Sequence, residues 1–204
     1  MDARLVTEPL DLAMLRRLRE VVEDATEHFD DYDYASALEV TEKFFWDFCD
    51  DYLELVKERS RREDAGGQSA KAAFVLALSV QLRLLAPFLP YVTEEAWSWW
   101  QDGSIHRAPW PDPEADLATV PRDPALLATA ADALAGIRGA KSVAKVSQRT
   151  EVTTVSVHAS QEALDLLTQA LEDVKAAGRV VGEIELVADD AADGLQVAAT
   201  LASD

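Results

Sequence analysis

Four basic residues recur at intervals of three or four positions: Arg138, Lys141, Lys145 and Arg149. A helix that continues through this segment places all four on one face, with no acid between Arg138 and Arg149. Lysine and arginine side chains on one face can contact the phosphates of RNA. The segment therefore predicts a phosphate-binding strip, and an ordinary solvated helix face remains the alternative.

Basic residues also follow a group of aromatic side chains. Phe45 and Trp46 precede Lys57 and Arg61 along one predicted helix. Unpaired RNA bases stack on aromatic rings beside cations, whereas the alternative is that each ring belongs to the protein core. With a third basic group at 16–19, the candidates for RNA contact are Arg16, Arg19, Phe45, Trp46, Lys57, Arg61, Arg138, Lys141 and Lys145.

Catalytic and metal chemistry have less support. The chain has three histidines: His28, His106 and His158. None has the spacing to a second ligand that a metal site requires. Cys49 lies among apolar residues of a predicted helix, which favours an inert buried thiol over a nucleophile. Adjacent acids such as Asp50 and Asp51 diverge by about 100° on a helix. We expect no catalytic residue, no metal and no cofactor.

The composition indicates an acidic chain with a substantial core. It has 38 acidic and 19 basic residues, a formal net charge of −19, so RNA binding requires a local basic patch. Hydrophobic residues make up 49 %, enough for a packed interior. A single cysteine excludes a disulfide framework. Without a bilayer-length apolar run or a signal peptide, we expect a cytoplasmic protein that does not contact a membrane.

An antiparallel bundle of four helices is predicted over residues 1–120. Asp11, Asp33 and Ser69 are the expected N-caps of the first three helices, and the fourth opens at Thr93. The second helix, from 33 to 62, is the longest. Gly66-Gly67 is expected to end it. A proline-rich segment, 103–122, reads as an extended strap to a domain boundary near 120.

Two expectations concern the interior of the bundle. Trp46, Phe48 and Tyr52 should face neighbouring helices. Arg83 lies in an otherwise apolar helix, and a buried guanidinium needs a carboxylate beside it. The expected partner is Glu94, Glu95 or Asp50.

A small α+β subdomain is predicted over residues 121–204. Asp123-Pro124 opens a helix that carries Leu127, Leu134 and Ile137 on its apolar face. The alternating segment 151–157 is a strand, 160–178 is a helix, and 180–187 and 195–201 are strands joined by a polar turn. The predicted fold class is mainly α, a helical bundle followed by this α+β subdomain.

Three stretches together resemble the anticodon-binding bundle of valyl-tRNA synthetases. They are FFWDFCDDYLELVK, LRLLAPFLPYVTEEAW and SIHRAPWP. The resemblance covers about residues 10 to 115. IRGAKSVAKVSQRTEV is similar to the segment that follows the bundle in bacterial members, and the similarity weakens after about 160.

The resemblance implies a part of such an enzyme. The ATP-binding motifs of the family, HIGH and KMSKS, are missing, and the segment Lys141–Lys145 does not match KMSKS. The implied protein is a non-catalytic, monomeric C-terminal portion of a valine–tRNA ligase that supports aminoacylation in translation. Its implied partners are tRNA(Val) and the catalytic and editing domains of the parent synthetase, which this sequence lacks.

The positions of the basic groups on antiparallel helices, taken together with the resemblance, suggest a role for each group. Arg16–Arg19 and Lys57–Arg62 are expected at one end of the bundle, with Phe45 or Trp46 beside them, as the anticodon-loop surface. Arg138, Lys141 and Lys145 are expected to contact the stem backbone. The main alternative, which the net charge favours, is an acidic protein-interaction module descended from such a domain that no longer binds RNA. A third alternative is an enzyme that uses Cys49.

Overall fold

The computed structural model describes residues 3–117, 124–189 and 194–202, which form two compact units. Unit 1 comprises Met1–Asp50 and Glu63–Arg122, and unit 2 comprises Asp51–Arg62 and Asp123–Asp204. The segment Asp51–Arg62, which the sequence analysis placed in the bundle, therefore belongs to unit 2. The predicted boundary near 120 lies outside the described residues.

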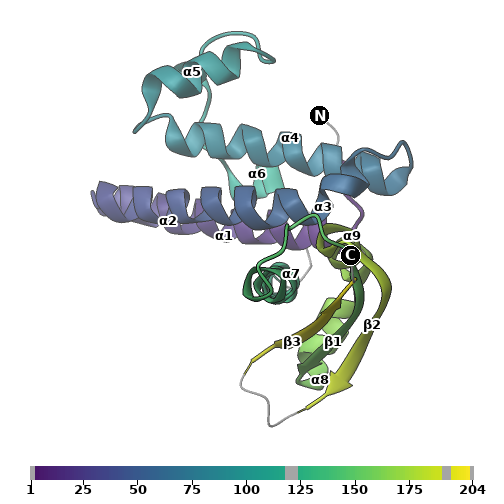
Figure 1. The fold of residues 1–204 in the computed structure, drawn as a ribbon. Coiled ribbons are helices and arrows are strands. Elements are labelled where there is room, and N and C mark those ends of the chain that lie inside the picture. The colour runs from purple at the N-terminus through teal and green to yellow at the C-terminus, as the bar shows by residue number, and fades with distance from the viewer. Residues whose placement is uncertain (1–2, 118–123, 190–193, 203–204) are drawn as a thin grey trace. The chain divides into compact units, whose positions relative to one another are not determined.

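Unit 1 is a helical bundle (Figure 1). Its elements are the 3-10 helix η1 (Ala3–Leu5), α1 (Pro9–Asp30), α2 (Tyr34–Asp47), α4 (Ala65–Leu85), α5 (Pro90–Ser98), the 3-10 helix η3 (Ile105–Arg107) and α6 (Pro113–Leu117). α1 packs against α2, α4 and α6, and α5 packs against α4. The apolar stripe of α1 forms its inner face, since Leu10, Met14 and Leu18 are almost fully buried.

The helix starts differ in part from those predicted. Asp33 is the N-cap of α2, as predicted, because its carboxylate accepts a hydrogen bond from the Ser36 N–H at 3.1 Å. Asp11 lies inside α1 and is completely buried, so its prediction as a cap is wrong. α4 begins earlier than predicted, capped by Asp64, with Gly66 and Gly67 in its first turn.

Ser69 has a tertiary contact in place of the predicted cap. Its hydroxyl donates to the buried Asp11 carboxylate at 2.6 Å and accepts from the N–H groups of Thr7 and Glu8 at 3.0 Å each. One serine of α4 therefore satisfies free backbone donors at the start of α1. Burial of both polar side chains is possible because they bond to each other.

The long second helix is interrupted. A π-helical turn, η2 (Phe48–Tyr52), separates α2 from α3 (Leu53–Ser60). Phe48 and Tyr52 are buried, as predicted. Trp46 is 54 % exposed, so the prediction that it faces neighbouring helices is wrong. Phe44 is almost fully buried where α2 meets the turn, and Trp46, two positions on, points to another side of the helix.

Arg83 is buried and paired with a carboxylate, as predicted, but the acid is none of the three expected partners. Its guanidinium contacts the Asp116 carboxylate at 3.0 Å and donates to the Ser79 carbonyl at 3.1 Å. Asp116 belongs to α6, a short helix in the segment that was predicted to be an extended strap. Glu94, one of the expected partners, instead accepts hydrogen bonds at 2.9 Å from the Ser104 hydroxyl and the Ile105 N–H.

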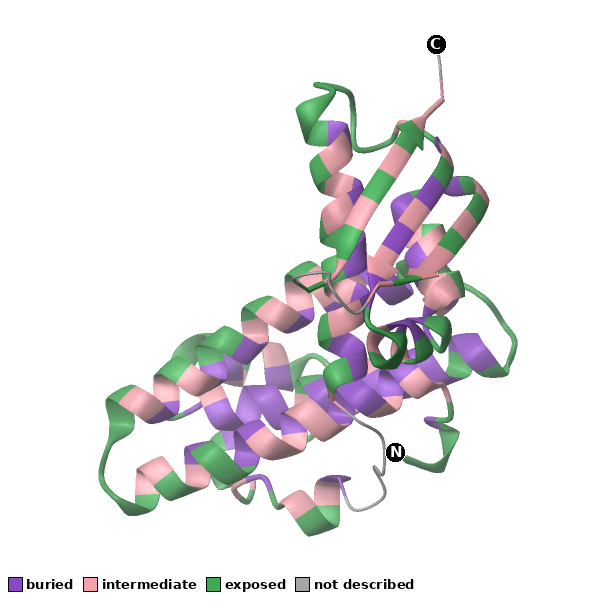
Figure 2. Ribbon diagram, turned by 90° about the horizontal axis from the view of Figure 1, so that it is seen from below, coloured by how far each residue is buried: buried purple, intermediate pink, exposed green. Residues whose placement is uncertain are grey.

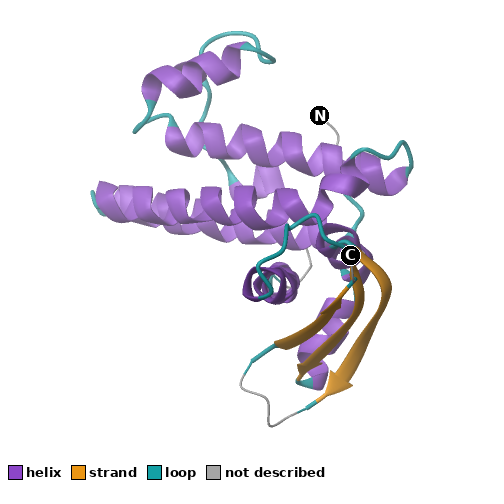
Figure 3. Ribbon diagram, in the orientation of Figure 1, coloured by secondary structure: helices purple, strands orange, loops and turns teal. Residues whose placement is uncertain are grey.

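Unit 2 is an α+β assembly around a three-stranded sheet (Figure 3). Besides α3 it contains α7 (Ala125–Val143), β1 (Val152–Ala159), α8 (Gln161–Thr168), α9 (Leu171–Gly178), β2 (Val180–Ala188) and β3 (Gln196–Leu201). The strand order is β2-β1-β3, with β2 parallel and β3 antiparallel to β1. The single helix predicted for 160–178 is divided at Gln169 and Ala170, and most of the predicted polar turn lies outside the described residues.

One face of the sheet carries the core of unit 2. On β1, Val152, Val155, Val157 and Ala159 are buried, and β3 alternates exposed with half-buried residues (Figure 2). α7 packs against β3, α8 and α9. Gly136 permits this approach, because a Cβ there would lie 2.5 Å from the Val197 side chain. The fold class, a mainly α bundle with a small α+β subdomain, agrees with the prediction.

Candidate nucleic-acid interface

The predicted basic strip does not form on a single helix, because α7 ends at Val143. The Val146 N–H bonds to the Lys141 carbonyl at 3.1 Å and the Lys145 N–H bonds to the Ser142 carbonyl at 3.0 Å. This pattern is a Schellman motif, with Lys145 in the left-handed conformation at φ 57°. Arg138 and Lys141 thus lie on the helix, while Lys145 and Arg149 follow it. The prediction of one helical face is wrong.

The structure nonetheless gathers basic residues from three separate segments of unit 2 around one cavity. The cavity has a volume of about 520 Å³. Its basic lining residues are Lys57, Arg61, Arg138, Lys141, Arg149 and Arg179. They come from α3, from α7 and the turn after it, and from the end of α9, three elements that pack against one another. Members of two predicted basic groups, Lys57–Arg62 and Arg138–Arg149, therefore share one site, and Lys145 is not among its lining residues.

Two carboxylates balance part of this charge. Glu54 contacts the Lys57 ammonium at 2.9 Å and the Arg138 guanidinium at 3.4 Å, and Glu58 contacts Arg61 at 2.7 Å. These side chains are 36–63 % exposed, so each pair stabilises the fold by less than about 1 kcal/mol and an incoming anion can compete for the cations. Six cations face two carboxylates at the cavity.

Two arginines of the cavity lie beyond the ends of helices, because Arg149 follows α7 and Arg179 follows α9. Arg149 is exposed and, within the described part of the chain, has no ion pair. Arg179 is half exposed, with the Glu151 carboxylate at 4.0 Å, and its backbone is left-handed at φ 55°. Arg179 was not among the predicted site residues, and nothing in its local sequence distinguishes it from other surface arginines.

Lys141 is different from the other cations, because it is only 1 % exposed. Its ammonium donates to the carbonyl oxygens of Gln148 at 3.1 Å and Gly178 at 2.9 Å. Burial, and then the nearby Arg179 and Arg138, lower the pKa of Lys141 below its ordinary value. Hydrogen bonds to two carbonyls favour the charged form and oppose this shift. The side chain is therefore an internal group and not a surface one.

The predicted RNA-contacting residues of unit 1 do not form a comparable basic site. Arg16 pairs with Glu20 at 3.5 Å, and Arg19 contacts Glu114, Glu23 and the Pro113 carbonyl. The rings of Phe45 and Trp46 pack edge to face, with centroids 5.3 Å apart. Arg16 and Arg19 are on α1, whereas the rings are on α2. Their expected shared surface with Lys57–Arg62 remains a prediction.

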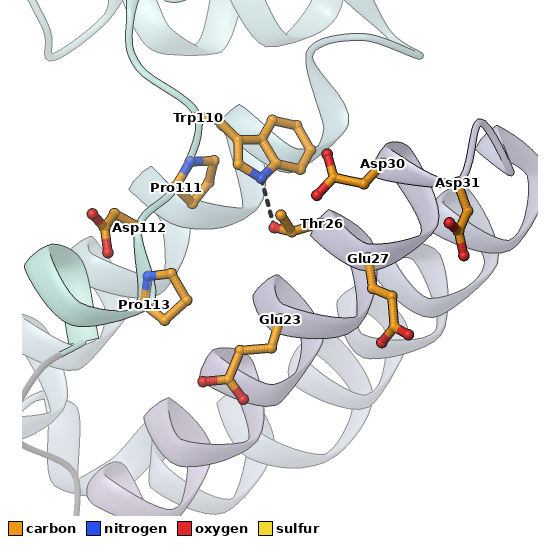
Figure 4. Close-up of a pocket in the computed structure, with 9 residues that line it drawn as sticks. All are labelled: Glu23, Thr26, Glu27, Asp30, Asp31, Trp110, Pro111, Asp112 and Pro113. Carbon is orange, nitrogen blue, oxygen red and sulfur yellow. Dashed lines mark hydrogen bonds between the residues drawn. The ribbon is translucent and has the colours of Figure 1, made fainter.

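A second cavity, in unit 1, has the opposite charge (Figure 4). It measures about 680 Å³, and carboxylates of α1, of its C-cap residue and of the segment before α6 line it: Glu23, Glu27, Asp30, Asp31 and Asp112. Trp110 donates from its indole N–H to the Thr26 hydroxyl at 2.9 Å at one side. A cavity with this charge repels phosphate groups. This cavity was not predicted from the sequence, because α1 and the segment 110–113 meet only in the folded chain.

Other candidate chemistry has limited structural support. Cys49 is half-buried, and burial followed by the charge of Asp50 raises the pKa of its thiol, so little thiolate is present near neutral pH. Among the described residues, no cluster of three or more histidine, cysteine or acidic side chains has the geometry to hold a metal ion. Within the same residues, no helix is long and apolar enough to cross a membrane.

The fold and the sequence define the class of this chain. Residues 11–158 match the family model of the anticodon-binding domain of tRNA ligase, and the chain belongs to that family. Its relatives include the valine–tRNA ligases of Thermobifida fusca, 53 % identical over 93 % of this chain, and Leifsonia xyli, 49 % identical over 89 %. The matched region is 22 % and 21 % of those relatives, so the chain spans about a fifth of their length. The predicted resemblance to valyl-tRNA synthetases is confirmed.

Proposed function

We propose that this chain is the tRNA-binding, non-catalytic C-terminal region of a valine–tRNA ligase. It would bind the anticodon stem-loop of tRNA(Val) and so support aminoacylation by the catalytic and editing domains of the parent synthetase. The family match and the valine–tRNA ligase relatives support this proposal. In this role the chain acts in the cytoplasm as part of a monomeric enzyme.

The observation that carries the proposal is the basic cavity of unit 2. In a chain with a net charge of −19, six cations and two carboxylates line one cavity. Long-range repulsion from the acidic surface is screened beyond about 8 Å at physiological ionic strength, so a phosphate at the cavity mainly experiences the local cations. Local concentration of charge is what RNA binding by an acidic protein requires.

The cavity suggests a revised division of roles. Lys57 and Arg61 line the same cavity as Arg138 and Arg149, so we assign all four to the RNA backbone. We assign the reading of anticodon bases to the two neighbouring rings of α2, the exposed Trp46 and the half-buried Phe45. Arg16, Arg19 and Lys145 remain candidate backbone contacts.

The second candidate function is an acidic protein-interaction module, and the cavity of Figure 4 favours it. Five carboxylates and an indole ring would suit a basic peptide better than RNA. The two functions differ in their dependence on salt, because binding of RNA phosphates releases condensed counterions.

The test measures binding of the 204-residue chain to a tRNA(Val) transcript over a series of salt concentrations. Under the proposal, the logarithm of the association constant falls linearly with the logarithm of the salt concentration. Lys57→Gln and Arg61→Gln should each flatten that slope by about one unit and weaken a non-cognate tRNA equally. Trp46→Ala should reduce the preference for tRNA(Val).

Arg107→Gln is the matched control, since Arg107 is exposed, lies in unit 1 and lines none of the cavities described above. It removes one positive charge and should leave the slope unchanged. Absence of tRNA binding at low salt would reject the proposal and leave the interaction module. Valine-dependent adenylate formation by the isolated chain would reject the non-catalytic assignment.

A further inference from the structure

The two carbonyl oxygens that accept hydrogen bonds from Lys141 each belong to a residue directly before an arginine of the basic cavity. Gln148 directly precedes Arg149, and Gly178 directly precedes Arg179. One buried ammonium therefore holds the backbone immediately before each of two arginines that line the basic cavity. The bonds span 7 and 37 positions of sequence, so they join the turn after α7 to the end of α9.

The backbone around this contact has conformations that need such support. Arg179 and Lys145 both have positive φ values, 55° and 57°, and neither is glycine. Left-handed backbone is unfavourable for an L-residue, so it persists where other contacts fix it. At Gly178, the Lys141 ammonium supplies one of these contacts directly beside the strained residue.

The charge of Lys141 also affects the cavity. Within the described residues, no carboxylate forms an ion pair with the ammonium, and a carbonyl oxygen satisfies a hydrogen bond without neutralising the charge. Arg138 and Arg179 lie close enough to disfavour its protonation. An anion in the cavity would stabilise all three cations together.

We propose that the basic cavity is a preorganised site for one phosphodiester segment of RNA, in which Arg149 and Arg179 bind the phosphate oxygens and Lys141 positions both arginines. A planar guanidinium group can donate two parallel hydrogen bonds to two oxygens of one phosphate. Lys141 itself does not touch the ligand, because only 1 % of it is exposed. This inference rests on the proposed function and adds the residues that form the site.

A positioning role for Lys141 and a direct contact of Lys141 with phosphate predict different salt dependences of tRNA binding. A direct contact removed by Lys141→Met would flatten the salt slope of tRNA binding by about one unit. A positioning residue that orients two arginines should instead flatten it by about two units, although only one charge is lost. A residue with only a structural role would lower the folded fraction and leave the slope of the folded protein unchanged.

The experiment measures the salt slope of binding to a tRNA(Val) transcript for the full chain and its variants. Arg149→Gln and Arg179→Asn should each flatten the slope by about one unit, since asparagine tolerates the left-handed backbone of Arg179. Lys141→Met should give the same salt slope as the double variant Arg149→Gln/Arg179→Asn. Lys141→Arg keeps the hydrogen-bond donors and the charge, so its salt slope should be close to that of the unaltered chain. Arg107→Gln serves again as the charge control.

Each result separates this inference from the proposed function. Binding of tRNA with normal slopes in the Arg149 and Arg179 variants would overturn the site and leave the proposed function intact. If folded Lys141→Met changed the salt slope by only one unit or not at all, the positioning role would be overturned. Absence of tRNA binding by the unaltered chain would reject the proposed function itself.

A second measurement does not depend on a folded Lys141 variant. Nuclear magnetic resonance of the arginine side-chain N–H groups should show shifts of Arg149 and Arg179 on addition of the tRNA transcript. An equal concentration of inorganic phosphate should give much smaller shifts. Larger shifts with phosphate, which the tRNA does not displace, would identify a small-anion site and overturn the inference.

Discussion

Arg59 and Asp173, 114 positions apart, form a two-point ion pair inside unit 2. Nε of Arg59 donates to one carboxylate oxygen of Asp173 at 2.9 Å and Nη2 donates to the other at 2.9 Å. The two side chains are only 8 % and 12 % exposed. This ion pair links α3 to α9. Because Lys57 and Arg61 lie on either side of Arg59 in the sequence, the pair also keeps them at the basic cavity.

Loss of this pair should destabilise unit 2. Asp173→Ala removes the carboxylate from a buried guanidinium, and we expect a decrease of about 3–5 kcal/mol in the free energy of unfolding, measured by urea denaturation. The double variant Arg59→Met/Asp173→Leu removes both charges and should cost distinctly less. A loss below about 1 kcal/mol for Asp173→Ala would show that the pair contributes little to stability.

The Arg83–Asp116 pair provides a similar test in unit 1. Asp116→Ala removes the carboxylate 3.0 Å from a guanidinium that is 8 % exposed, and we expect a loss of about 3 kcal/mol in the free energy of unfolding. Asp116→Asn keeps an oxygen acceptor and should cost less. Glu95→Ala, an exposed acid on α5, is the control and should change stability by no more than about 0.5 kcal/mol.

The left-handed residue at the end of α7 allows a stabilising substitution. Lys145→Gly relieves a backbone with φ 57° and should raise the free energy of unfolding by about 0.5–1 kcal/mol. Lys145→Ala keeps the strain and should not stabilise the protein. Both variants remove the same charge, so they should have equal effects on tRNA binding. Equal stabilities of Lys145→Ala and Lys145→Gly in thermal denaturation would contradict the assigned Schellman motif.

The buried Lys141 should make stability depend on alkaline pH. Because its folded-state pKa is lowered, the unfolded chain binds more protons between that value and about 10.5. The free energy of unfolding contributed by this residue therefore rises with pH through that window. We expect the stability difference between the natural chain and Lys141→Met, measured by denaturation from neutral pH to about pH 10, to change in favour of the lysine. A difference independent of pH would show that the two carbonyl contacts cancel the effect of burial.

Local sequence signals predicted the main elements. The apolar face of α7, the Asp33 cap and the alternation in β1 each depend on residues close together in the sequence, so the sequence predicted them. The requirement for an acid beside Arg83 was also predictable, since a guanidinium in an apolar helix must be paired. The aromatic and proline motifs indicated the family.

Only the tertiary structure determined which partners meet. Asp116 and not Glu94 pairs with Arg83, and Ser69 bonds to Asp11 across 58 positions. The cavity depends on the end of α7, where a turn closed by backbone hydrogen bonds replaces the predicted helix. Arg179 joins it because α9 packs against α3 and α7. Periodicity specifies which face of an element is buried, whereas the choice among acids, carbonyls and cations far apart in sequence depends on how the faces pack together.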